Sequence, residues 1–453
     1  MQSINPATEV EIARYAPFTD KAVAEMIAAV NRSQKAWSTL SFDQRQPIFI
    51  RAAEILRKRS RQYAELMADE MGKPIREGEA EVKKCAAVCD YYAAHAAEFL
   101  ADETVKTEAE NSYISYRPLG VILAIMPWNF PFWQVFRCLA PNLMAGNAVL
   151  LKHAPNVTGS ALAIESLMKA AGLPQNLFKT LIIEETQVEA VIQHKAVRGV
   201  ALTGSTKAGQ IVASQAGQAL KRVVLELGGS DPFIVLEDAD LDKAVQACVT
   251  SRLINSGQSC IAAKRIIVCE AVYDEFLARL KEQLKNKKMG DPKAEKTDIG
   301  PLARPDLRDQ LHRQVQDSMD QGAKCVMGGK IPDRPGYYYP VTLLADIKSG
   351  MPAYDEELFG PVAVVIKAAD EETAITIAND TDYGLGAALF TADRKKGERI
   401  AANALDAGCC FVNDYVRSDP RLPFGGIKKS GYGRELSRAG IREFVNHKTI
   451  YIA

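Results

Sequence analysis

Short apolar runs alternate with helical segments from residue 121 onward, and this alternation limits the possible folds more than any other feature. Residues 121–126 form a continuous apolar run that Pro127 stops, and residues 148–151 form a second one. Runs of this length are typical of strands buried on both faces. Residues 158–171 then have the pattern of a helix. The repeated order of strand, helix and strand predicts a parallel sheet covered by helices.

A second series of the same kind follows Gly229 and predicts a second α/β unit, with a cleft between the two. Residues 1–100, by contrast, have a largely helical pattern. Residues 449–452 favour a strand, but little chain is left to pair with it, so this tail could extend a partner's sheet. The other expected elements are strands at 200–202, 222–225, 265–269, 362–367, 387–391 and 409–413, and helices at 273–287 and 371–379.

Length and charge exclude several classes of protein. A chain of 453 residues is too long for one compact core and should divide into two or three domains. Lys and Arg together number 56, as do Asp and Glu, which argues against a nucleic-acid or membrane-surface protein. We see no signal peptide and no membrane-spanning run, so we expect a cytoplasmic protein. Its nine cysteines lack a framework spacing and are expected to be mostly free thiols.

Cys260 is the leading candidate for chemistry. Most cysteines are small buried apolar residues, and Cys85, Cys89, Cys409 and Cys410 are expected to be of that kind. Cys260 differs because it follows the flexible polar turn Gly-Gln-Ser and precedes two alanines. A turn leading into a helix would bring backbone N–H groups to the sulfur and lower its pKa. Such a thiolate attacks carbonyl carbon.

Two polar residues follow buried strands at positions where α/β proteins form their sites. Glu226 comes before a Leu-Gly-Gly turn, and Asn129 lies between Pro127 and Pro131. A solvated glutamate and a capping asparagine are the ordinary alternatives. A partly buried glutamate is also a suitable base for water, and a fixed asparagine amide can stabilise an oxyanion.

The remaining motifs are less specific. Residues 203–209 place a Gly/Ser turn between a strand and a helix, which is a phosphate-binding geometry. Gln210 and Ile211 stand where a Walker loop has Lys and Ser/Thr, which excludes that loop. No G-x-G-x-x-G follows the early strands. The five histidines form no metal-type pair, so we expect no metal site.

Taken together, these motifs resemble those of the aldehyde dehydrogenase superfamily, and in particular a compact bacterial type of succinate-semialdehyde dehydrogenase. The resemblance runs from residue 4 to residue 431, and its specificity comes from five motifs in the family's order. It implies two Rossmann-like α/β domains and a small β oligomerisation element. The matching motifs are Pro127-Trp128-Asn129-Phe130-Pro131, Thr203-Gly204-Ser205, Glu226-Leu227-Gly228-Gly229, Gly257-Gln258-Ser259-Cys260 and Glu357-Leu358-Phe359-Gly360-Pro361.

The resemblance implies the following roles. Cys260 would be the nucleophile, and its backbone N–H would form the oxyanion hole with Asn129. Glu226 would activate the water that releases the acid. Lys152 would hold the adenosine ribose, Ser205 the pyrophosphate and Glu357 the nicotinamide ribose. The residues expected around the cofactor are Met126, Pro127, Trp128, Lys152, His153, Pro155, Thr203, Gly204, Ser205, Leu227, Gly228, Glu357 and Phe359.

The cofactor would be NADP or NAD. NAD-preferring relatives often have a glutamate three residues after the lysine, where it repels a 2′-phosphate. Pro155 occupies that position here, and Lys152 with His153 could favour a phosphate. We therefore expect NADP to be tolerated, and the preference between the two stays open.

The substrate would be an aldehyde with a distal carboxylate. Arg137 matches an arginine that binds this carboxylate in succinate-semialdehyde dehydrogenases, although it could also be a surface residue of a helix. Ser418 resembles a second contact, with Arg417 and Arg421 as alternates. Glutarate semialdehyde is the near alternative, because one methylene changes pocket energy by only ~1–3 kcal/mol. A CoA-acylating enzyme and a catalytically silent binding protein are further alternatives, and the presence of Glu226 and of the other chemical residues argues against them.

The resemblance also predicts the division of the chain and its assembly. Residues 1–96 and 119–228 would form the dinucleotide-binding domain, and residues 229–430 the catalytic domain. Residues 97–118 and 431–453 would form the oligomerisation element of a homodimer or homotetramer.

Overall fold

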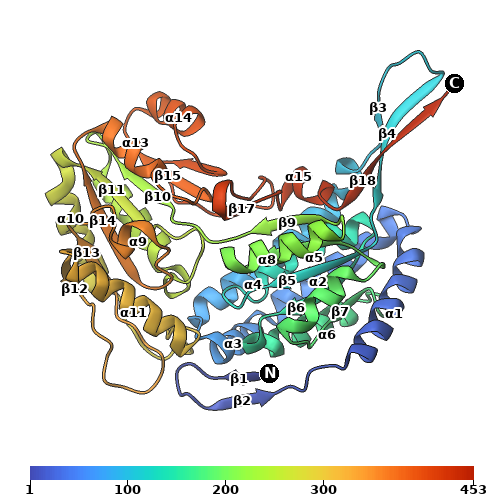
Figure 1. The fold of residues 1–453 in the computed structure, drawn as a ribbon, viewed down its shortest axis with the longest axis horizontal. Coiled ribbons are helices and arrows are strands. Elements are labelled where there is room, and N and C mark those ends of the chain that lie inside the picture. The colour runs from blue at the N-terminus through green and yellow to red at the C-terminus, as the bar shows by residue number, and fades with distance from the viewer.

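The computed structural model describes all 453 residues and contains two α/β bodies, a projecting arm and an N-terminal hairpin (Figure 1). Each body is built around its own mostly parallel sheet. The hairpin consists of β1 (Gln2–Ile4) and β2 (Glu11–Arg14), which the sequence pattern did not indicate. The predicted α/β class is therefore correct, with one parallel sheet in each series.

The first body contains a six-stranded sheet in the order β17-β9-β8-β5-β6-β7. All neighbours are parallel except the short β17, which runs antiparallel to β9. β5 and β6 consist almost entirely of buried residues, which explains their unbroken apolar sequences. The strands are β5 (Val121–Met126), β6 (Ala148–His153), β7 (Phe178–Thr180), β8 (Val197–Thr203), β9 (Arg222–Glu226) and β17 (Gly431–Tyr432).

Eight helices surround this sheet and share one continuous hydrophobic core with it. Local signals set their ends: a capping box of Ser41 and Gln44 starts α2, and a left-handed glycine, Gly146, ends α5. The helices are α1 (Asp20–Ser38), α2 (Phe42–Lys58), α3 (Ser60–Met71), α4 (Ile75–Phe99), α5 (Trp133–Ala145), α6 (Thr158–Ala170), α7 (Val188–Gln193) and α8 (Thr206–Gln218).

The second body contains a seven-stranded sheet in the order β12-β13-β14-β11-β10-β15-β16, with only β12 antiparallel to its neighbour. Side chains alternate between two separate cores, so that Phe233 and Val235 face one and Ile234 faces the other. The strands are β10 (Pro232–Val235), β11 (Arg265–Cys269), β12 (Lys324–Met327), β13 (Thr342–Ala345), β14 (Val362–Ala368), β15 (Gly386–Phe390) and β16 (Cys409–Val412).

Helices cover both faces of this second sheet. Residues of α9 and α10 belong to one core and residues of α11 to α14 to the other. The helices are α9 (Leu241–Leu253), α10 (Glu270–Lys285), α11 (Pro305–Asp320), α12 (Pro352–Asp355), α13 (Glu371–Asn379) and α14 (Arg394–Asn403).

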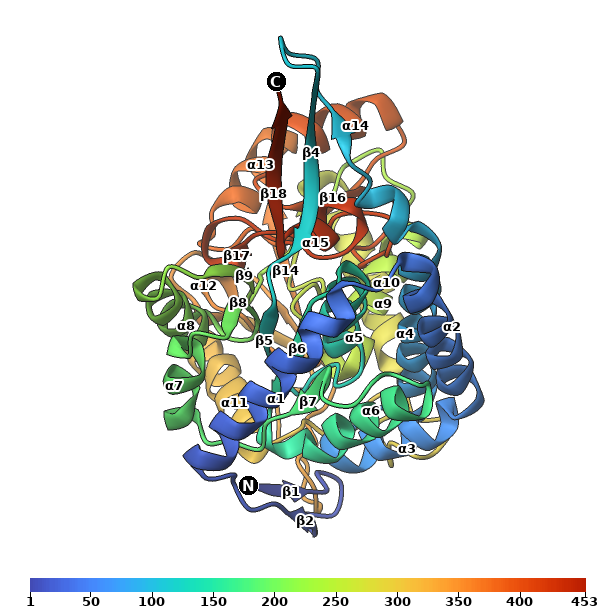
Figure 2. The same ribbon diagram turned by 90° about the vertical axis from the view of Figure 1, so that its right-hand side faces the viewer.

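The arm corrects the expectation that little chain is left to pair with the C-terminal tail. β18 (Val445–Ile452) pairs antiparallel with β4 (Asn111–Pro118) of the same chain along its whole length, and β3 (Glu103–Thr104) completes the sheet. The tail therefore has an intramolecular partner that lies far away in sequence. Figure 2 shows the two long strands side by side, extending beyond the body above α15 (Ser437–Arg442).

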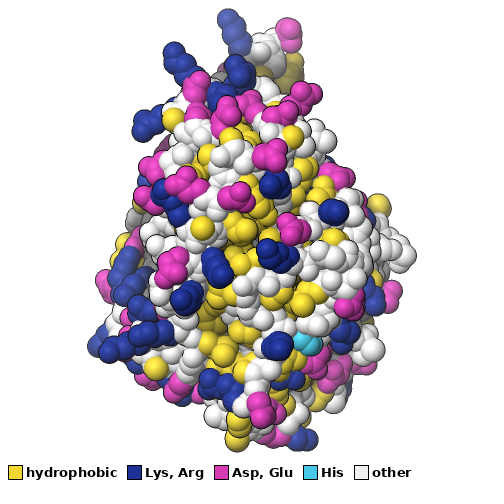
Figure 3. Space-filling view, turned by 90° about the vertical axis from the view of Figure 1, so that its left-hand side faces the viewer, with side chains coloured by type: hydrophobic (Ala, Val, Ile, Leu, Met, Phe, Trp, Pro, Cys, Tyr) yellow, Lys and Arg dark blue, Asp and Glu magenta, His cyan; other side chains and the backbone are white.

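The surface shows no extended field of one charge. Figure 3 shows basic and acidic side chains interspersed over one face of the molecule. None of the helices combines the length and the apolar character that crossing a bilayer requires.

Candidate active site

Four strands of the first sheet end beside one another, and each delivers a predicted site residue. Asn129 follows β5, Lys152 lies at the end of β6, Ser205 follows β8, and Glu226 ends β9. These strands are parallel neighbours in the sheet, so their carboxyl ends meet at one edge. The sheet topology thus explains how residues nearly a hundred positions apart gather on one side.

The second sheet approaches this edge with the opposite ends of its strands. Cys260 lies just before β11, and Glu357 lies just before β14. Gly229 lies so close to the loop that carries Cys260 that a Cβ atom there would stand 2.7 Å from the Cys260 carbonyl oxygen. The nucleophile candidate is therefore held between the carboxyl edge of one sheet and the amino edge of the other.

The turn before Cys260 has an unusual backbone. Asn255, Ser256 and Gly257 all have left-handed φ angles, of 54°, 56° and 78°. Such angles are costly for residues other than glycine and persist only when the surroundings fix them. Arg252 supplies part of this support, since its Nη2 donates to the carbonyl oxygens of Gly257 (2.7 Å) and Gly360 (2.6 Å).

The expectation of a helix after Cys260 is wrong. Residues 258–264 form an irregular loop, and the next element is the strand β11. Burial raises the pKa of the Cys260 thiol to about 12, although Lys264 and Arg137 act in the opposite direction. No helix dipole supports the thiolate here, so in the ligand-free chain the sulfur carries its proton at neutral pH.

Asn129 lies against the Cys260 loop, as expected. Its Nδ2 donates to the carbonyl oxygen of Gln258 at 3.1 Å, and its own carbonyl oxygen accepts from Asn255 Nδ2 at 2.6 Å. Asn129 is buried, and its side-chain oxygen has no hydrogen-bond partner. The contacts fix the amide two residues from the sulfur, and a second N–H of the same group can donate to a bound oxyanion.

Glu226 is buried beside Arg137, and neither of its carboxyl oxygens has a hydrogen-bond partner. Arg137 Nη2 lies 3.9 Å from Glu226, and the same guanidinium pairs with Glu435. Burial raises the pKa of Glu226 well above its usual value, while Arg137 opposes this shift. A carboxyl group in this state gives up its proton at a higher pH than an ordinary glutamate and is then the stronger base.

Glu357 joins the two edges. Its Oε1 accepts from the backbone N–H of Gly229 and from Lys264 Nζ, each at 3.1 Å. Lys264 also donates to the carbonyl oxygen of Cys260 at 2.6 Å. The predicted cofactor residue is thereby connected to the predicted nucleophile through one lysine.

The predicted adenosine and phosphate side of the site fits an anionic dinucleotide. Lys152 is buried at the end of β6, and its ammonium has no ion pair or hydrogen bond within the chain. Ser205 is exposed and caps α8, a thirteen-residue helix whose first N–H groups are available to phosphate oxygens. Trp128 and Phe359 also meet, edge to face, with ring centroids 5.8 Å apart.

His153 does not support the expected attraction to a phosphate. Both ring nitrogens lie at hydrogen-bond distance from backbone carbonyl oxygens, those of Met126 and Pro131. Burial lowers the pKa of His153 to about 4, so the ring is neutral at pH 7. The positive charge on this side of the site comes from Lys152.

A cavity of about 180 Å³ opens onto Cys260. Arg137 and Ser418, the two predicted substrate contacts, both line it, as does Arg417. Arg417 and Arg421, the alternates, are exposed and pair with Asp414 and Asp419. One side of the wall comes from α4, α5 and the turn before α5: Glu77, Ala80, Glu81, Lys84, Phe130, Trp133 and Gln134.

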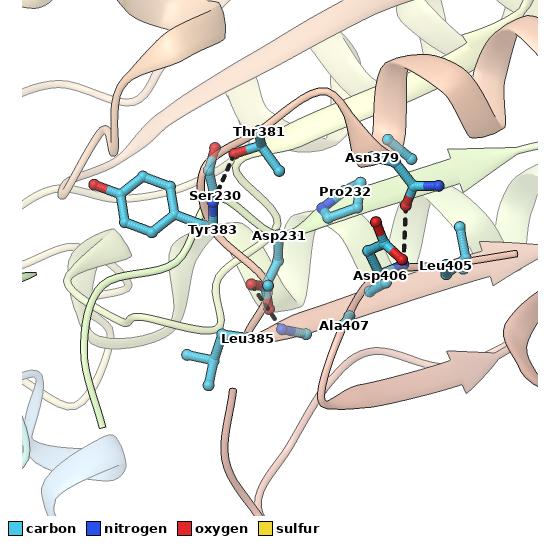
Figure 4. A pocket seen from close by; sticks show the side chains of 14 residues that line it. Ser230, Asp231, Pro232, Asn379, Thr381, Tyr383, Leu385, Leu405, Asp406 and Ala407 are labelled. Atoms are coloured by element: carbon cyan, nitrogen blue, oxygen red, sulfur yellow. Dashed lines mark hydrogen bonds between the residues drawn. The ribbon is translucent and has the colours of Figure 1, made fainter. Parts of the chain in front are cut away.

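A second, much smaller cavity lies behind Asp231 (Figure 4). Asp231 is buried, its Oδ1 accepts from Gly386 N at 3.0 Å, and burial raises its pKa to about 7. The space measures about 10 Å³, which is room for a single water molecule. It is too small for an aldehyde or a cofactor.

Several residues that organise the site were missed by the sequence reasoning. Glu77 accepts from the backbone N–H of the strained Asn255, Lys264 links Glu357 to the Cys260 loop, and Lys84 donates to Ser418 Oγ. Each lies in a helix or a loop with an ordinary polar pattern. The one available signal was Lys264, which stands four residues after the cysteine and directly before a strand.

Comparison with known proteins finds relatives that match this chain over nearly its whole length. Residues 1–450 match the model of the aldehyde dehydrogenase family. A "Probable succinate-semialdehyde dehydrogenase [NADP(+)]" of Synechocystis sp. is 48% identical over 451 residues, covering 100% of this chain and 99% of that protein. The "Succinate semialdehyde dehydrogenase [NAD(P)+] Sad" of Escherichia coli is 46% identical, covering 99% of this chain and 97% of that protein.

A solved structure has the same fold. The crystal structure of succinic semialdehyde dehydrogenase from Streptococcus pyogenes, in complex with NADP+, superposes with a TM-score of 0.97 at 40% identity. The match covers 100% of this chain and 99% of that one.

Proposed function

Because the chain belongs to the aldehyde dehydrogenase family, we propose that it oxidises succinate semialdehyde to succinate with NADP or NAD as the hydride acceptor. One observation carries the substrate proposal: the cavity that contains Cys260 is also lined by Arg137, Ser418 and two further cations, Lys84 and Arg417. A four-carbon aldehyde with a carboxylate at its far end matches a cavity with a nucleophile and several cationic or hydrogen-bonding side chains.

The reaction begins at Cys260. The Cys260 thiol first loses its proton to solvent, and the resulting thiolate adds to the aldehyde carbon; a carbon–sulfur bond forms and the carbonyl oxygen becomes an alkoxide. Asn129 Nδ2 and the Cys260 backbone N–H donate to this oxygen. The loss of one such donor lowers kcat by roughly 10²–10³-fold. NADP or NAD, held by Lys152, Ser205 and Glu357, would supply the acceptor for the hydride that leaves the same carbon. The acyl group then remains on the sulfur as a thioester.

Glu226 completes the turnover in this proposal. As the carboxylate it takes a proton from water, the resulting hydroxide adds to the thioester carbon, and the carbon–sulfur bond breaks. The products are succinate and the Cys260 thiolate, with the proton passing from Glu226 to solvent. Glu226 lies 3.9 Å from Arg137, which lines the cavity that contains Cys260, and this proximity supports the role.

The cofactor proposal rests on Lys152, Ser205 and Glu357. The unpaired Lys152 ammonium and the open N-terminus of α8 suit phosphate oxygens, and Glu357 suits ribose hydroxyls. Pro155 leaves the position three residues after Lys152 without a carboxylate. This arrangement supports acceptance of NADP, in agreement with the cofactors named for the relatives.

We also propose the predicted division into domains and a homodimer or homotetramer. The two sheets support a dinucleotide-binding part over residues 1–96 and 119–228 and a catalytic part over residues 229–430. The arm of residues 97–118 and the strand β18 support the oligomerisation element. Residues 431–432 form β17, which pairs with β9 of the first sheet. The start of the C-terminal oligomerisation segment therefore also belongs to the dinucleotide-binding part.

A panel of aldehydes assayed with each cofactor tests the function. We expect succinate semialdehyde to give the highest kcat/KM, glutarate semialdehyde to follow, and butanal, which lacks the carboxylate, to be at least tenfold poorer. Addition of CoA should leave the product unchanged as the free acid. Preference for butanal over both semialdehydes would contradict the substrate proposal, and a CoA thioester product would contradict the role of Glu226.

A further inference from the structure

Lys84 is a cation in the substrate cavity without a negative partner. It lies in α4 and lines the same cavity as Cys260. Its Nζ donates one hydrogen bond, to Ser418 Oγ at 2.6 Å, and lies 4.2 Å from the centroid of the Trp133 ring. No carboxylate oxygen comes within 4 Å of it. An enclosed ammonium without a counter-ion costs free energy, so its presence calls for an explanation.

The carboxylates in its neighbourhood are already engaged. Glu81 pairs with the buried Lys73 and accepts the backbone N–H groups of Phe132 and Trp133, both at 2.9 Å. Asp419 pairs with Arg421, which lowers the pKa of Asp419 to about 2. Neither group is free to neutralise Lys84.

Arg137, a fully buried cation of the same cavity, differs in this respect. Its guanidinium pairs with Glu435 and lies 3.9 Å from Glu226. Its charge is therefore balanced within the protein, whereas the charge of Lys84 is not. Of the two, Lys84 has more to gain from an anionic ligand.

We propose that Lys84, together with Ser418, binds the distal carboxylate of the substrate and selects carboxylated aldehydes over uncharged ones. This inference rests on the proposed function and adds a residue to it. The ammonium would donate to one carboxylate oxygen and the Ser418 hydroxyl to the other. The Trp133 ring keeps the ammonium in place by a cation–π contact while the cavity is free of substrate.

The chain offers a matched control on the same helix. Lys83, the preceding residue, is 62% exposed and lies 3.8 Å from Glu79. We would compare Lys84→Met with Lys83→Met and the unmodified chain, and use Lys84→Arg as a conservative variant. Methionine keeps the length of the side chain and removes its charge.

The first measurement is the ratio of kcat/KM for succinate semialdehyde to kcat/KM for butanal. We expect Lys84→Met to lower this ratio at least about tenfold, mainly through KM for the semialdehyde. Lys83→Met should keep the ratio of the unmodified chain, and Lys84→Arg should recover part of the loss. An equal loss for both aldehydes, or an unchanged ratio, would overturn the inference.

The second measurement does not depend on turnover. Butyrate carries the same carboxylate without the aldehyde, so it should protect Cys260 from iodoacetamide when it occupies the cavity. We expect Lys84→Met to need at least about tenfold more butyrate for half-protection than the unmodified chain or Lys83→Met. Equal protection in all three proteins would refute the role of Lys84.

The two measurements separate this inference from the proposed function. If the unmodified chain fails to oxidise succinate semialdehyde, the proposed function is wrong, and butyrate protection still decides whether Lys84 binds a carboxylate. The melting temperature provides a check on folding. Removal of an unpaired ammonium should leave it unchanged or raise it, whereas a structural lysine would lower it on removal.

Discussion

The number of backbone oxygens around a cation separates the structural cations of this chain from the functional ones more clearly than burial does. Arg45, Arg252 and Arg265 are buried, and each donates several hydrogen bonds to backbone carbonyl oxygens, although Arg45 Nε and two nitrogens of Arg252 have no partner. Lys84 and Lys152 have no such set of partners. Cations of the first kind hold the fold together, and those of the second kind are suited to ligands.

The thiol of Cys260 should reveal its raised pKa through alkylation. Because the pKa is about 12, the thiolate fraction rises about tenfold per pH unit throughout the range 7 to 10. We expect the rate of iodoacetamide labelling at Cys260, followed by mass spectrometry, to rise in the same proportion without reaching a plateau. A plateau below pH 9 in the ligand-free protein would show that the sulfur is ionised more easily than its burial allows.

Replacement of Cys260 tests its role directly. Cys260→Ala should abolish dehydrogenase turnover, because no other thiol lines the cavity, while NADP binding measured by fluorescence stays within about threefold. Cys409→Ala is the matched control, since Cys409 is also partly exposed but does not line the cavity. Normal turnover in Cys260→Ala would exclude a thioester on this residue.

At the scale of the element, the sequence predicts the positions of strands and helices better than it predicts the contacts between elements that are distant in the chain. The expected strand at 265–269 and helix at 371–379 agree with β11 and α13 in their bounds, because apolar runs and caps are local signals. The tail at 449–452 was misjudged because its partner β4 lies more than 300 residues earlier. The cysteine turn was misjudged because its strained backbone depends on contacts from α4 and α9.

Substitution of Glu77 tests whether α4 holds the turn before Cys260 in place. Its carboxylate accepts the N–H of Asn255, the first of the three left-handed residues before Cys260. We expect Glu77→Leu to lower kcat at least about tenfold, because a shift of the loop misplaces the sulfur. Glu77→Gln retains an acceptor oxygen and should keep most of the activity.

Glu79→Gln, on the exposed side of the same helix, provides the control for Glu77. The measurements are kcat and the alkylation rate of Cys260 in Glu77→Leu, Glu77→Gln and Glu79→Gln. The support by Glu77 would be disproved if Glu77→Leu kept both values.

At the scale of the whole molecule, the two sheets contribute opposite edges to one site. The first supplies Asn129, Lys152 and Glu226 from strand carboxyl ends, and the second supplies Cys260 and Glu357 from segments before its strands. Motif order along the chain anticipated which residues would gather. It did not indicate Lys84, because an isolated lysine in a helix has no recognisable pattern until the cavity beside it is known.

The arm should govern assembly. Deletion of residues 447–453 removes most of the partner of β4 and leaves that strand's hydrogen-bonding groups exposed. We expect light scattering to show a smaller complex or aggregates, compared with the oligomer of the full chain. Lys448→Ala, which keeps the strand, should not change the mass. An unchanged mass after deletion would contradict the oligomerisation role of the arm.

The pairing of β4 with β18 also has a consequence for synthesis. A ribosome makes β18 about 330 residues after β4. At roughly 5–20 residues per second, β4 waits on the order of 15 to 65 s for its intramolecular partner. During this interval β3 pairs only with Tyr113 and Ile114, on the opposite edge of β4, and the edge that later binds β18 stays open. The nascent chain therefore presents an open sheet edge to its surroundings, and we expect chaperones to bind it there before release.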